Sequence, residues 1–343
     1  MKEKIEKSKR ILFVVSGGVG RNIFATAVLR NLKKEYPKKD IFCICGCPDV
    51  FQNNPNAKRI YGFDKPQHLF EDYIFENNET VILDVEPYRH PEYLAGNKHV
   101  VECWCELLDI PCDSVKPELF FVRDEKSVSQ SFMTKYKKPV ILLQHTGGKV
   151  PDNNTKEARI AAKVSMFRRG LTEEVIQELT DRLIADGYIV GSVQHQNQFQ
   201  PKGSELISYP LRATMGLIPY VEGIISIDSF LQHASAAFNV QSLVLWAGTS
   251  PERLGYTIHK NIRKTVCVTP ECHRPNSFAF DIHPSGAMWN CPYSEACCDY
   301  TTEEILNAYK EMKGDNYDKA VLDNKPGILV ETLKECECKH VSN

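Results

Sequence analysis

The chain has 343 residues, more than one hydrophobic core usually organises, which favours two domains. Its 42% hydrophobic and 25% charged residues are ordinary for a globular protein, and its apolar runs are far shorter than the roughly 18–20 residues that span a bilayer. A net charge of −2 gives no general attraction to nucleic acid or anionic lipid. The basic start Met1–Arg10 lacks the apolar stretch of a secretory signal, so we expect a cytoplasmic protein.

The chain opens with a strand, a glycine turn and a helix. Ile11–Val15 is a continuous apolar run typical of a buried parallel strand, and Ser16–Gly20 follows it. A helical pattern runs from there to a stop at Pro37, and Asp40–Cys45 reads as the next strand. Strand, helix and strand in this order predict a doubly wound parallel sheet.

The rest of the first half continues this alternation and ends in a polar stretch. Thr80–Leu83 reads as a strand and Val100–Leu108 as a helix. Residues 113–138 are polar and lysine-rich toward their end, so we place a domain boundary near 125–138.

The same pattern then restarts. The predicted elements are a strand at Pro139–Leu143, a helix capped by Thr172, a strand at Tyr188–Val193, a strand at Gly223–Ile227, a helix at Phe230–Phe238, a strand at Ser242–Trp246 and a helix opened by the capping box Thr301-x-x-Glu304. We therefore predict an α/β protein with two Rossmann-like domains, residues 1–135 and 136–315, followed by a tail over 316–343. Ligands of such folds sit beyond the carboxyl ends of the strands, and two domains can face each other there across a cleft.

Two strand ends carry candidate binding groups. In the first turn, Gly18 and Gly20 offer backbone N–H groups to an anion or a sugar hydroxyl, although such turns also serve plain strand–helix packing. After Gly223–Ile227 come Asp228, Ser229 and His233 on the first turn of a helix, where the positive helix end suits a diphosphate. Asp228 as a simple helix cap and His233 as a core histidine are the competing interpretations.

Two further loops leave the same predicted sheet edge. His145 and Thr146 follow the strand at Pro139–Leu143, and Gly248 opens the loop after Ser242–Trp246. Because the carboxyl ends of parallel strands share one edge, we expect these loops to converge with Asp228 on one pocket.

Several of these segments together resemble glycosyltransferase family 9, the heptosyltransferases of lipopolysaccharide core synthesis. They are Ile11–Lys33, Ile224–Ala237, Gly248–Arg253 and the cysteine-rich segment before Thr301. The most specific match, Asp228-Ser229-x-x-x-His233-x-x-Ala236-Ala237, is similar to the family's Asp-Thr-Gly-x-x-His-x-Ala-Ala element, which holds the donor's diphosphate and sugar. Arg169 falls where the family carries a donor-phosphate lysine.

This resemblance implies a GT-B fold, with residues 1–135 as acceptor domain and 136–315 as donor domain. It further implies an inverting, metal-independent transfer of a sugar from a nucleotide-sugar, such as an ADP- or UDP-sugar, to a hydroxyl of a glycan or lipopolysaccharide-type acceptor. No cofactor is then required for catalysis.

One departure concerns the catalytic base. The family's first turn usually reads Gly-Asp, with the aspartate as proposed base, whereas Arg21 follows Gly20 here. Arginine stays protonated and cannot accept a proton. Asp84 and Glu86, at the end of the Thr80–Leu83 strand, are the leading substitutes, and His90 and His99 come next.

The cysteines form a separate candidate site. Cys267, Cys272, Cys291 and Cys297 supply four thiols that would suit a structural zinc. Free buried thiols and a disulfide are the alternatives. In Asp40–Cys45, by contrast, Cys43 and Cys45 alternate as on one face of a strand, where thiols act as small hydrophobes.

Three other functions stay open. The acceptor could be a hydroxymethylated base of DNA, against which the nearly neutral charge argues. The same scaffold could hydrolyse or epimerise a sugar nucleotide. A non-catalytic sugar-nucleotide-binding protein is the third alternative, favoured by the arginine at position 21.

Overall fold

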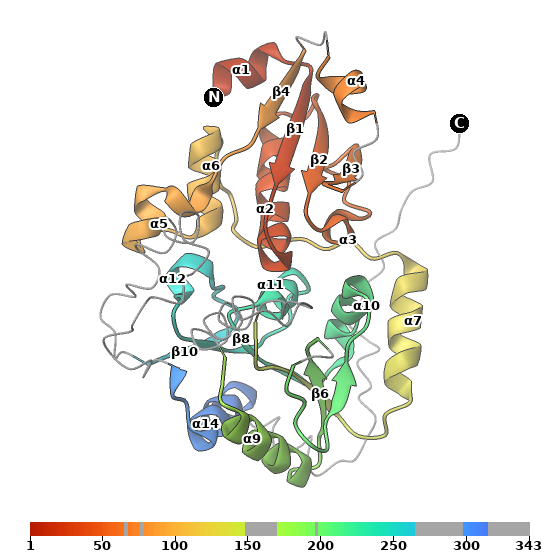
Figure 1. The fold of residues 1–343 in the computed structure, drawn as a ribbon, viewed down its shortest axis with the longest axis vertical. Coiled ribbons are helices and arrows are strands. Elements are labelled where there is room, and N and C mark those ends of the chain that lie inside the picture. The colour runs from red at the N-terminus through yellow and green to blue at the C-terminus, as the bar shows by residue number, and fades with distance from the viewer. Residues whose placement is uncertain (65–67, 76–78, 148–169, 196–197, 265–297, 315–343) are drawn as a thin grey trace, which may run out of the picture.

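The computed structural model describes residues 1–64, 68–75, 79–147, 170–195, 198–264 and 298–314. Within them the strands form two separate parallel sheets, stacked one above the other along the long axis of the molecule (Figure 1). The two-sheet α/β architecture expected from the sequence is thereby confirmed.

The N-terminal half is built on a four-stranded sheet in the order β3-β2-β1-β4, with every pair parallel. Its elements are α1 (Lys2–Lys7), β1 (Arg10–Val15), α2 (Val19–Glu35), β2 (Asp40–Cys45), α3 (Pro48–Phe51), β3 (Arg59–Gly62), α4 (Leu69–Tyr73), β4 (Thr80–Leu83), the 3₁₀ turn η1 (Pro87–Arg89), α5 (Pro91–Ala95) and α6 (Val100–Leu108). The apolar run of β1 lies at the centre because its side chains are buried on both faces of the sheet.

The C-terminal half is built on a six-stranded parallel sheet in the order β10-β9-β8-β5-β6-β7. Its elements, with the helix α7 that precedes them, are α7 (Arg123–Thr134), β5 (Val140–Gln144), α9 (Glu173–Ala185), β6 (Ile189–Val193), β7 (Glu205–Ile207), α10 (Leu211–Gly216), η2 (Ile218–Tyr220), β8 (Gly223–Ile227), α11 (Phe230–Ala237), β9 (Leu243–Trp246), α12 (Pro251–Leu254), β10 (Lys260–Arg263) and α14 (Thr302–Lys313). Read from β5 outward, the order corresponds to the 3-2-1-4-5-6 arrangement of a Rossmann sheet.

Each sheet reverses its strand order once. In the first sheet the reversal lies between β1 and β4, and in the second between β5 and β8. At this switch point, the connections after two neighbouring strands run to opposite faces of the sheet and leave a crevice between them. Ligands of such folds bind in this crevice. The topology therefore marks the residues after β1, β4, β5 and β8 as site residues.

The two halves share one hydrophobic core and two arginine contacts. Buried residues of α2, including Phe24, belong to the same cluster as Leu231 and Leu254 of the C-terminal half. Arg253 of α12 donates to the main-chain oxygens of Tyr93 (2.7 Å) and Leu94 (2.8 Å) at the end of α5.

Arg212 of α10 makes the second contact between the halves. It donates to the main-chain oxygen of Asp49 (2.9 Å) and to that of Phe120, and it pairs with Glu125 of α7. The relative position of the two halves is thus fixed by apolar packing and by directed hydrogen bonds.

The predicted elements match the observed ones to within a residue or two, but the polar stretch 113–138 differs. It contains the helix α7, whose one buried residue is Ser129, so no apolar stripe announces it. The boundary near 125–138 stays a prediction. Cys43 and Cys45 are buried in the main core on one face of β2, as expected.

The described helices include none with the length and apolar character that crossing a membrane requires.

Candidate active site

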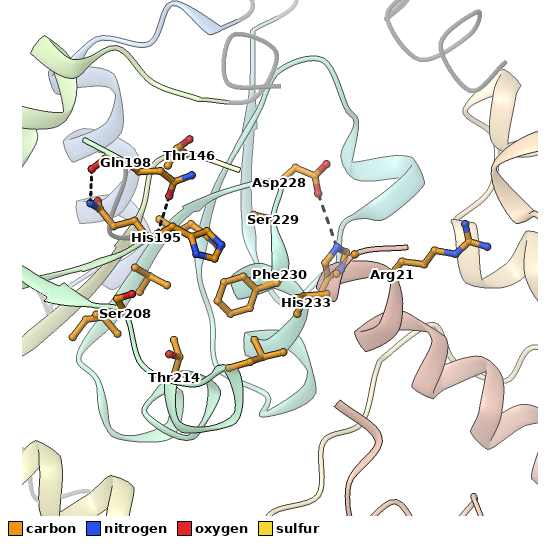
Figure 2. Close-up of a pocket in the computed structure, with 18 of the residues that line it drawn as sticks. Arg21, Thr146, His195, Gln198, Ser208, Thr214, Asp228, Ser229, Phe230 and His233 are labelled. Carbon is orange, nitrogen blue, oxygen red and sulfur yellow. Dashed lines mark hydrogen bonds and ion pairs between the residues drawn. The ribbon is translucent and has the colours of Figure 1, made fainter. Parts of the chain in front are cut away.

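A pocket of about 620 Å³ lies between the two halves, at both switch points. The N-terminal half lines it with Gly18–Arg21, Phe24 and Tyr88, the residues that follow β1 and β4. The C-terminal half supplies, among others, Thr146 after β5 and Asp228–Phe230 after β8. Figure 2 shows the polar residues of the second half around this space. The pocket is therefore a site to which both sheets contribute.

Two helices begin at the pocket without a side-chain cap. Gly18 is the N-cap of α2 and Ser229 that of α11, and neither cap position makes a side-chain hydrogen bond to its helix. The amide of Leu231 in α11 instead donates to Gln144 Oε1 at 3.3 Å. Since the first turn of a helix carries partial positive charge, two helix ends from opposite halves favour a bound anion here.

The two helices approach closely because residue 20 is a glycine. A Cβ atom at Gly20 would lie 3.0 Å from Cδ2 and 3.3 Å from Nε2 of His233 on α11. A Cβ at Gly18 would meet nothing within 4 Å. The glycine turn thus serves close packing between the halves at Gly20 and leaves open space at Gly18.

A buried polar cluster surrounds Asp228 and His233, each 3% exposed. Their side chains approach to 4.0 Å between Nε2 of His233 and Oδ1 of Asp228, as Figure 2 shows. The other ring nitrogen of His233, Nδ1, lies 2.9 Å from the hydroxyl of Tyr256. Burial, and next the negative charge of Asp228, raise the pKa of Tyr256 well above its usual value, so this hydroxyl keeps its proton.

Gln232 ties this cluster to the surrounding chain. Its Nε2 donates to the main-chain oxygen of Leu254 (3.1 Å) and contacts Asp228 Oδ1 at 3.5 Å. Its own main-chain oxygen lies 2.9 Å from Nε2 of His259. These contacts hold the Asp228 carboxylate in place at the start of α11.

Arg21, at the position where the resemblance leads us to expect an aspartate, turns away from the C-terminal half (Figure 2). Its guanidinium pairs with Glu86 at 2.8 Å, with 9% and 35% of the two side chains exposed. It also lies 5.2 Å from the ring centres of Tyr88 and Trp104. The backbone of Arg21 lies at the pocket while its charge is taken up inside the N-terminal half.

The carboxylates expected to replace the aspartate lie elsewhere. Asp84 is exposed, and neither Asp84 nor Glu86 is among the described residues that line the pocket. Besides its pairing with Arg21, Glu86 accepts from the amide of Tyr88 at 3.1 Å and caps η1. Of the next candidates, His90 caps α5 and His99 caps α6. The base assignment to Asp84 or Glu86 stays a prediction, which these contacts do not favour.

The wall opposite Arg21 is a network of amides and imidazoles after β5 and β6. His145 Nε2 lies 2.9 Å from Gln194 Oε1, which also accepts from Ser192 Oγ at 2.6 Å. Burial lowers the pKa of His145, against the opposing effect of its bond to Gln194. His145 therefore reaches the pocket through Gln194, whereas Thr146 lines it directly.

The remaining predicted site residues fall in two groups. Gly248 is buried in the loop after β9 and is not among the described lining residues. Arg169 and the four cysteines Cys267, Cys272, Cys291 and Cys297 lie outside the described residues. The structure thus brings together Gly18, Gly20, Arg21, Thr146, Asp228, Ser229 and His233 around one pocket.

Sequence reasoning missed several residues of this pocket. Gln194, His195 and Gln198 follow β6 directly, so the strand-end argument used for Asp228 would have found them. Ser208 and Tyr209 follow β7, and Thr214 lies in α10, two elements that the sequence pattern did not predict. Tyr256, which contacts His233, carries no local signal.

No protein-family model and no curated protein matches the chain. Solved structures do. A glycosyl transferase of family 9 from Veillonella parvula is 12% identical with a TM-score of 0.61, over 89% of this chain and 97% of that one. The ADP-heptose lipopolysaccharide heptosyltransferase II of E. coli is 16% identical with a TM-score of 0.57, over 88% and 98%.

A third similar structure is the iron-containing dodecameric glycosyltransferase TibC of enterotoxigenic E. coli, at 12% identity and a TM-score of 0.61, over 89% of this chain and 76% of that one. The resemblance to glycosyltransferase family 9 is therefore confirmed at the level of the fold: the chain has the GT-B architecture of these glycosyltransferases, two Rossmann-like sheets facing each other.

Proposed function

We propose that the protein is a glycosyltransferase that moves a sugar from a nucleotide-sugar donor to a hydroxyl acceptor. The observation that carries this proposal is the pocket of about 620 Å³ at the switch points of both sheets, where α2 and α11 begin without side-chain caps. Such a pocket has room for two substrates: an anionic donor held at the strand ends of one sheet and a neutral acceptor held at those of the other.

We assign the donor to the C-terminal half. The start of α11, with Asp228 and Ser229, would hold the diphosphate and sugar, as the family's corresponding element does. The polar wall of Gln194, Gln198 and Thr214 would receive the nucleoside. The acceptor would then enter along Gly18–Arg21 and Tyr88, which makes residues 1–135 the acceptor domain and 136–315 the donor domain.

The reaction that fits is a direct displacement at the anomeric carbon with inversion. Helix ends and main-chain amides would stabilise the departing nucleoside diphosphate, which makes a divalent cation dispensable. The solved structures include a heptosyltransferase in complex with ADP-D-β-D-heptose, so ADP-heptose is the first donor to test and UDP-, GDP- and CDP-sugars follow.

Thermal unfolding with this panel of donors tests the proposal. A true donor at 100 times its Kd should stabilise the protein by about 2.7 kcal/mol. Nucleotide release should then depend on an added glycan acceptor and persist in EDTA. Release that stops in EDTA would refute metal independence and leave the transfer itself standing.

The same measurements separate the alternatives. Nucleotide release at full rate without any acceptor would identify a hydrolase or epimerase. Tight donor binding without turnover would identify a binding protein. Transfer only to DNA that contains hydroxymethylated bases would identify that acceptor class instead of a glycan.

A further inference from the structure

Two buried side chains after β5 carry polar groups that the described part of the chain does not satisfy. Gln144, the last residue of β5, is 5% exposed, and Thr146 is 4% exposed. Both line the pocket. Within the described residues, the hydroxyl of Thr146 and the amide nitrogen of Gln144 make no hydrogen bond. Because buried polar groups are paired as a rule, their partner is to be sought in a bound ligand.

The orientation of the Gln144 amide is set by the helix that follows β8. Its Oε1 accepts from the main-chain amide of Leu231 at 3.3 Å, in the first turn of α11. Ser229, the N-cap residue of this helix, makes no side-chain hydrogen bond to it, so Gln144 caps the helix from a different strand. With its oxygen turned to α11, the amide presents the two N–H groups of Nε2 to a ligand.

We propose that Gln144 binds the donor as well as capping the helix, by donating from Nε2 to an oxygen of the donor's diphosphate. The inference rests on the proposed glycosyltransferase function and adds a residue to its donor site. Position supports it first. Nε2 and Oε1 belong to one amide group, so Nε2 stands at the same helix end as the Leu231 amide. The first turn of a helix is where the macrodipole favours a phosphate.

The charges at this helix end support it next. Asp228, directly before the N-cap residue, is 3% exposed and lines the pocket. Its carboxylate can only accept hydrogen bonds, and its negative charge opposes a phosphate beside it. An anion at this place therefore depends on groups that donate. The Nε2 of Gln144 is such a group, and it reaches the helix end from the strand next to that of Asp228.

The test compares Gln144→Glu with the wild type by calorimetric titration at pH 8, with ADP and adenosine as probes. Glutamate keeps an oxygen for the Leu231 amide, but it replaces the two N–H groups by a second oxygen that shares a negative charge. The Kd of ADP should rise by more than about 100-fold, because a hydrogen bond to a charged group is lost and like charges meet. The Kd of adenosine, which carries no phosphate, should stay as in the wild type.

Thermal unfolding shows whether the variant is folded. Because an acceptor for the Leu231 amide remains and a carboxylate suits the positive end of a helix, we expect a cooperative transition. A residue that served as a cap alone would then leave the affinity for ADP unchanged. Gln130→Glu at an exposed position of α7 makes the same chemical change away from the pocket and should bind ADP as the wild type does.

A second variant covers the case in which Gln144→Glu does not fold. Gln144→Met keeps the volume of the side chain and removes both the oxygen and the nitrogen. If Gln144 were only a cap, this change would free the Leu231 amide for the phosphate, and ADP would bind at least as tightly as before. Loss of a phosphate contact should instead raise the Kd of ADP by about tenfold to 150-fold and leave that of adenosine unchanged.

The outcomes distinguish this inference from the proposed function. Unchanged affinity for ADP in either folded variant, or an equal loss for ADP and adenosine, would overturn the role of Gln144. If the donor panel shows tighter binding of another nucleoside diphosphate, that compound and its nucleoside replace ADP and adenosine as probes. A wild type that binds no nucleoside diphosphate and no nucleotide-sugar would instead refute the proposed function itself.

Discussion

The turn after β1 and the turn after β8 both join a strand to a helix at the pocket, but the first contributes main-chain groups and the second contributes side chains. Gly17–Arg21 after β1 contributes main chain, and its one charged side chain is directed into its own half. Asp228–His233 after β8 contributes buried side chains to the shared space. The arginine contacts repeat this division, because Arg212 and Arg253 belong to the C-terminal half and reach main-chain oxygens of the other. The C-terminal half thus supplies the arginines that join the halves and the buried Asp228 and His233 of the pocket.

The largest expected effect comes from removing the contact that Arg253 makes with the N-terminal half. Arg253→Met removes the side-chain donor from the main-chain oxygens of Tyr93 and Leu94, of which the Tyr93 oxygen keeps the amide of Gly96. Two hydrogen bonds to a charged group are worth about 3 to 6 kcal/mol together, so the free energy of unfolding should fall by about that amount in urea titrations. Arg263→Met is the control, because Arg263 pairs with the exposed Glu252 at 3.6 Å and should cost less than about 1 kcal/mol. Equal losses would show that Arg253 does not join the halves.

The next test addresses the side chains of the second turn. Asp228→Ala removes a buried carboxylate from the start of α11 and should weaken donor binding by about 1.5 to 3 kcal/mol, or roughly tenfold to 150-fold. Calorimetric titration with ADP-heptose measures it. Asp181→Ala on the exposed face of α9 should bind as the wild type does. Unchanged affinity in a folded Asp228→Ala protein would take this residue out of the site.

A smaller effect concerns two buried histidines, His99 of the N-terminal half and His259 of the C-terminal half. Burial lowers the pKa of His99 to about 3 and that of His259 to about 4, so below pH 6.5 the unfolded chain binds protons that the folded protein does not. The contribution of these histidines to the free energy of unfolding is therefore complete above pH 6.5. Toward pH 4, the free energy of unfolding falls by up to about 1.4 kcal/mol per pH unit for each histidine.

His99→Asn removes one of these contributions and keeps a side-chain acceptor at the cap of α6. The pH slope of its unfolding free energy between pH 6 and 4 should be shallower than that of the parent. His68→Asn at an exposed position should leave the slope as it is. Identical slopes in the parent and His99→Asn would contradict the assignment.

The smallest expected effect tests the main-chain role of the first turn. Gly20→Ser places a Cβ 3.0 Å from the ring of His233 and should cost about 1 kcal/mol of stability by overpacking. Gly18→Ser adds the same atoms where nothing lies within 4 Å, at a cap position that serine favours. Thermal unfolding of the pair should rank Gly20→Ser below Gly18→Ser, and the reverse ranking would refute the close-packing role.

The sequence predicted most strands of the two sheets, though not β3, β7 and β10, and one side of the pocket, because those features are local. Apolar runs such as Ile11–Val15 report burial directly, and Asp228 stands immediately after such a run. The polar helix α7 was missed because its exposed surface leaves no stripe of apolar residues.

The interface could not be predicted for a different reason. Arg253 meets Tyr93 across 160 positions of the chain, and Arg212 meets Asp49 across 163. His233 and Tyr256 are 23 positions apart and share no periodicity. Pairings of this kind follow from how the two sheets are docked, which no local pattern encodes.

Main-chain oxygens are present in every polypeptide, whatever its side chains. The hydrogen bonds of Arg253 to α5 end on its carbonyl groups. Beyond them, the contact asks only for the ring of Tyr93, 5.8 Å from the guanidinium, and for the glycine at position 96, where a Cβ would lie 3.1 Å from Nη2. A C-terminal half with these arginines would accept a different N-terminal sequence of the same backbone shape that keeps these two residues and the apolar face of α2. Under the proposed division into acceptor and donor halves, chimeras that exchange residues 1–135 would offer evolution and protein engineers a route to new acceptors.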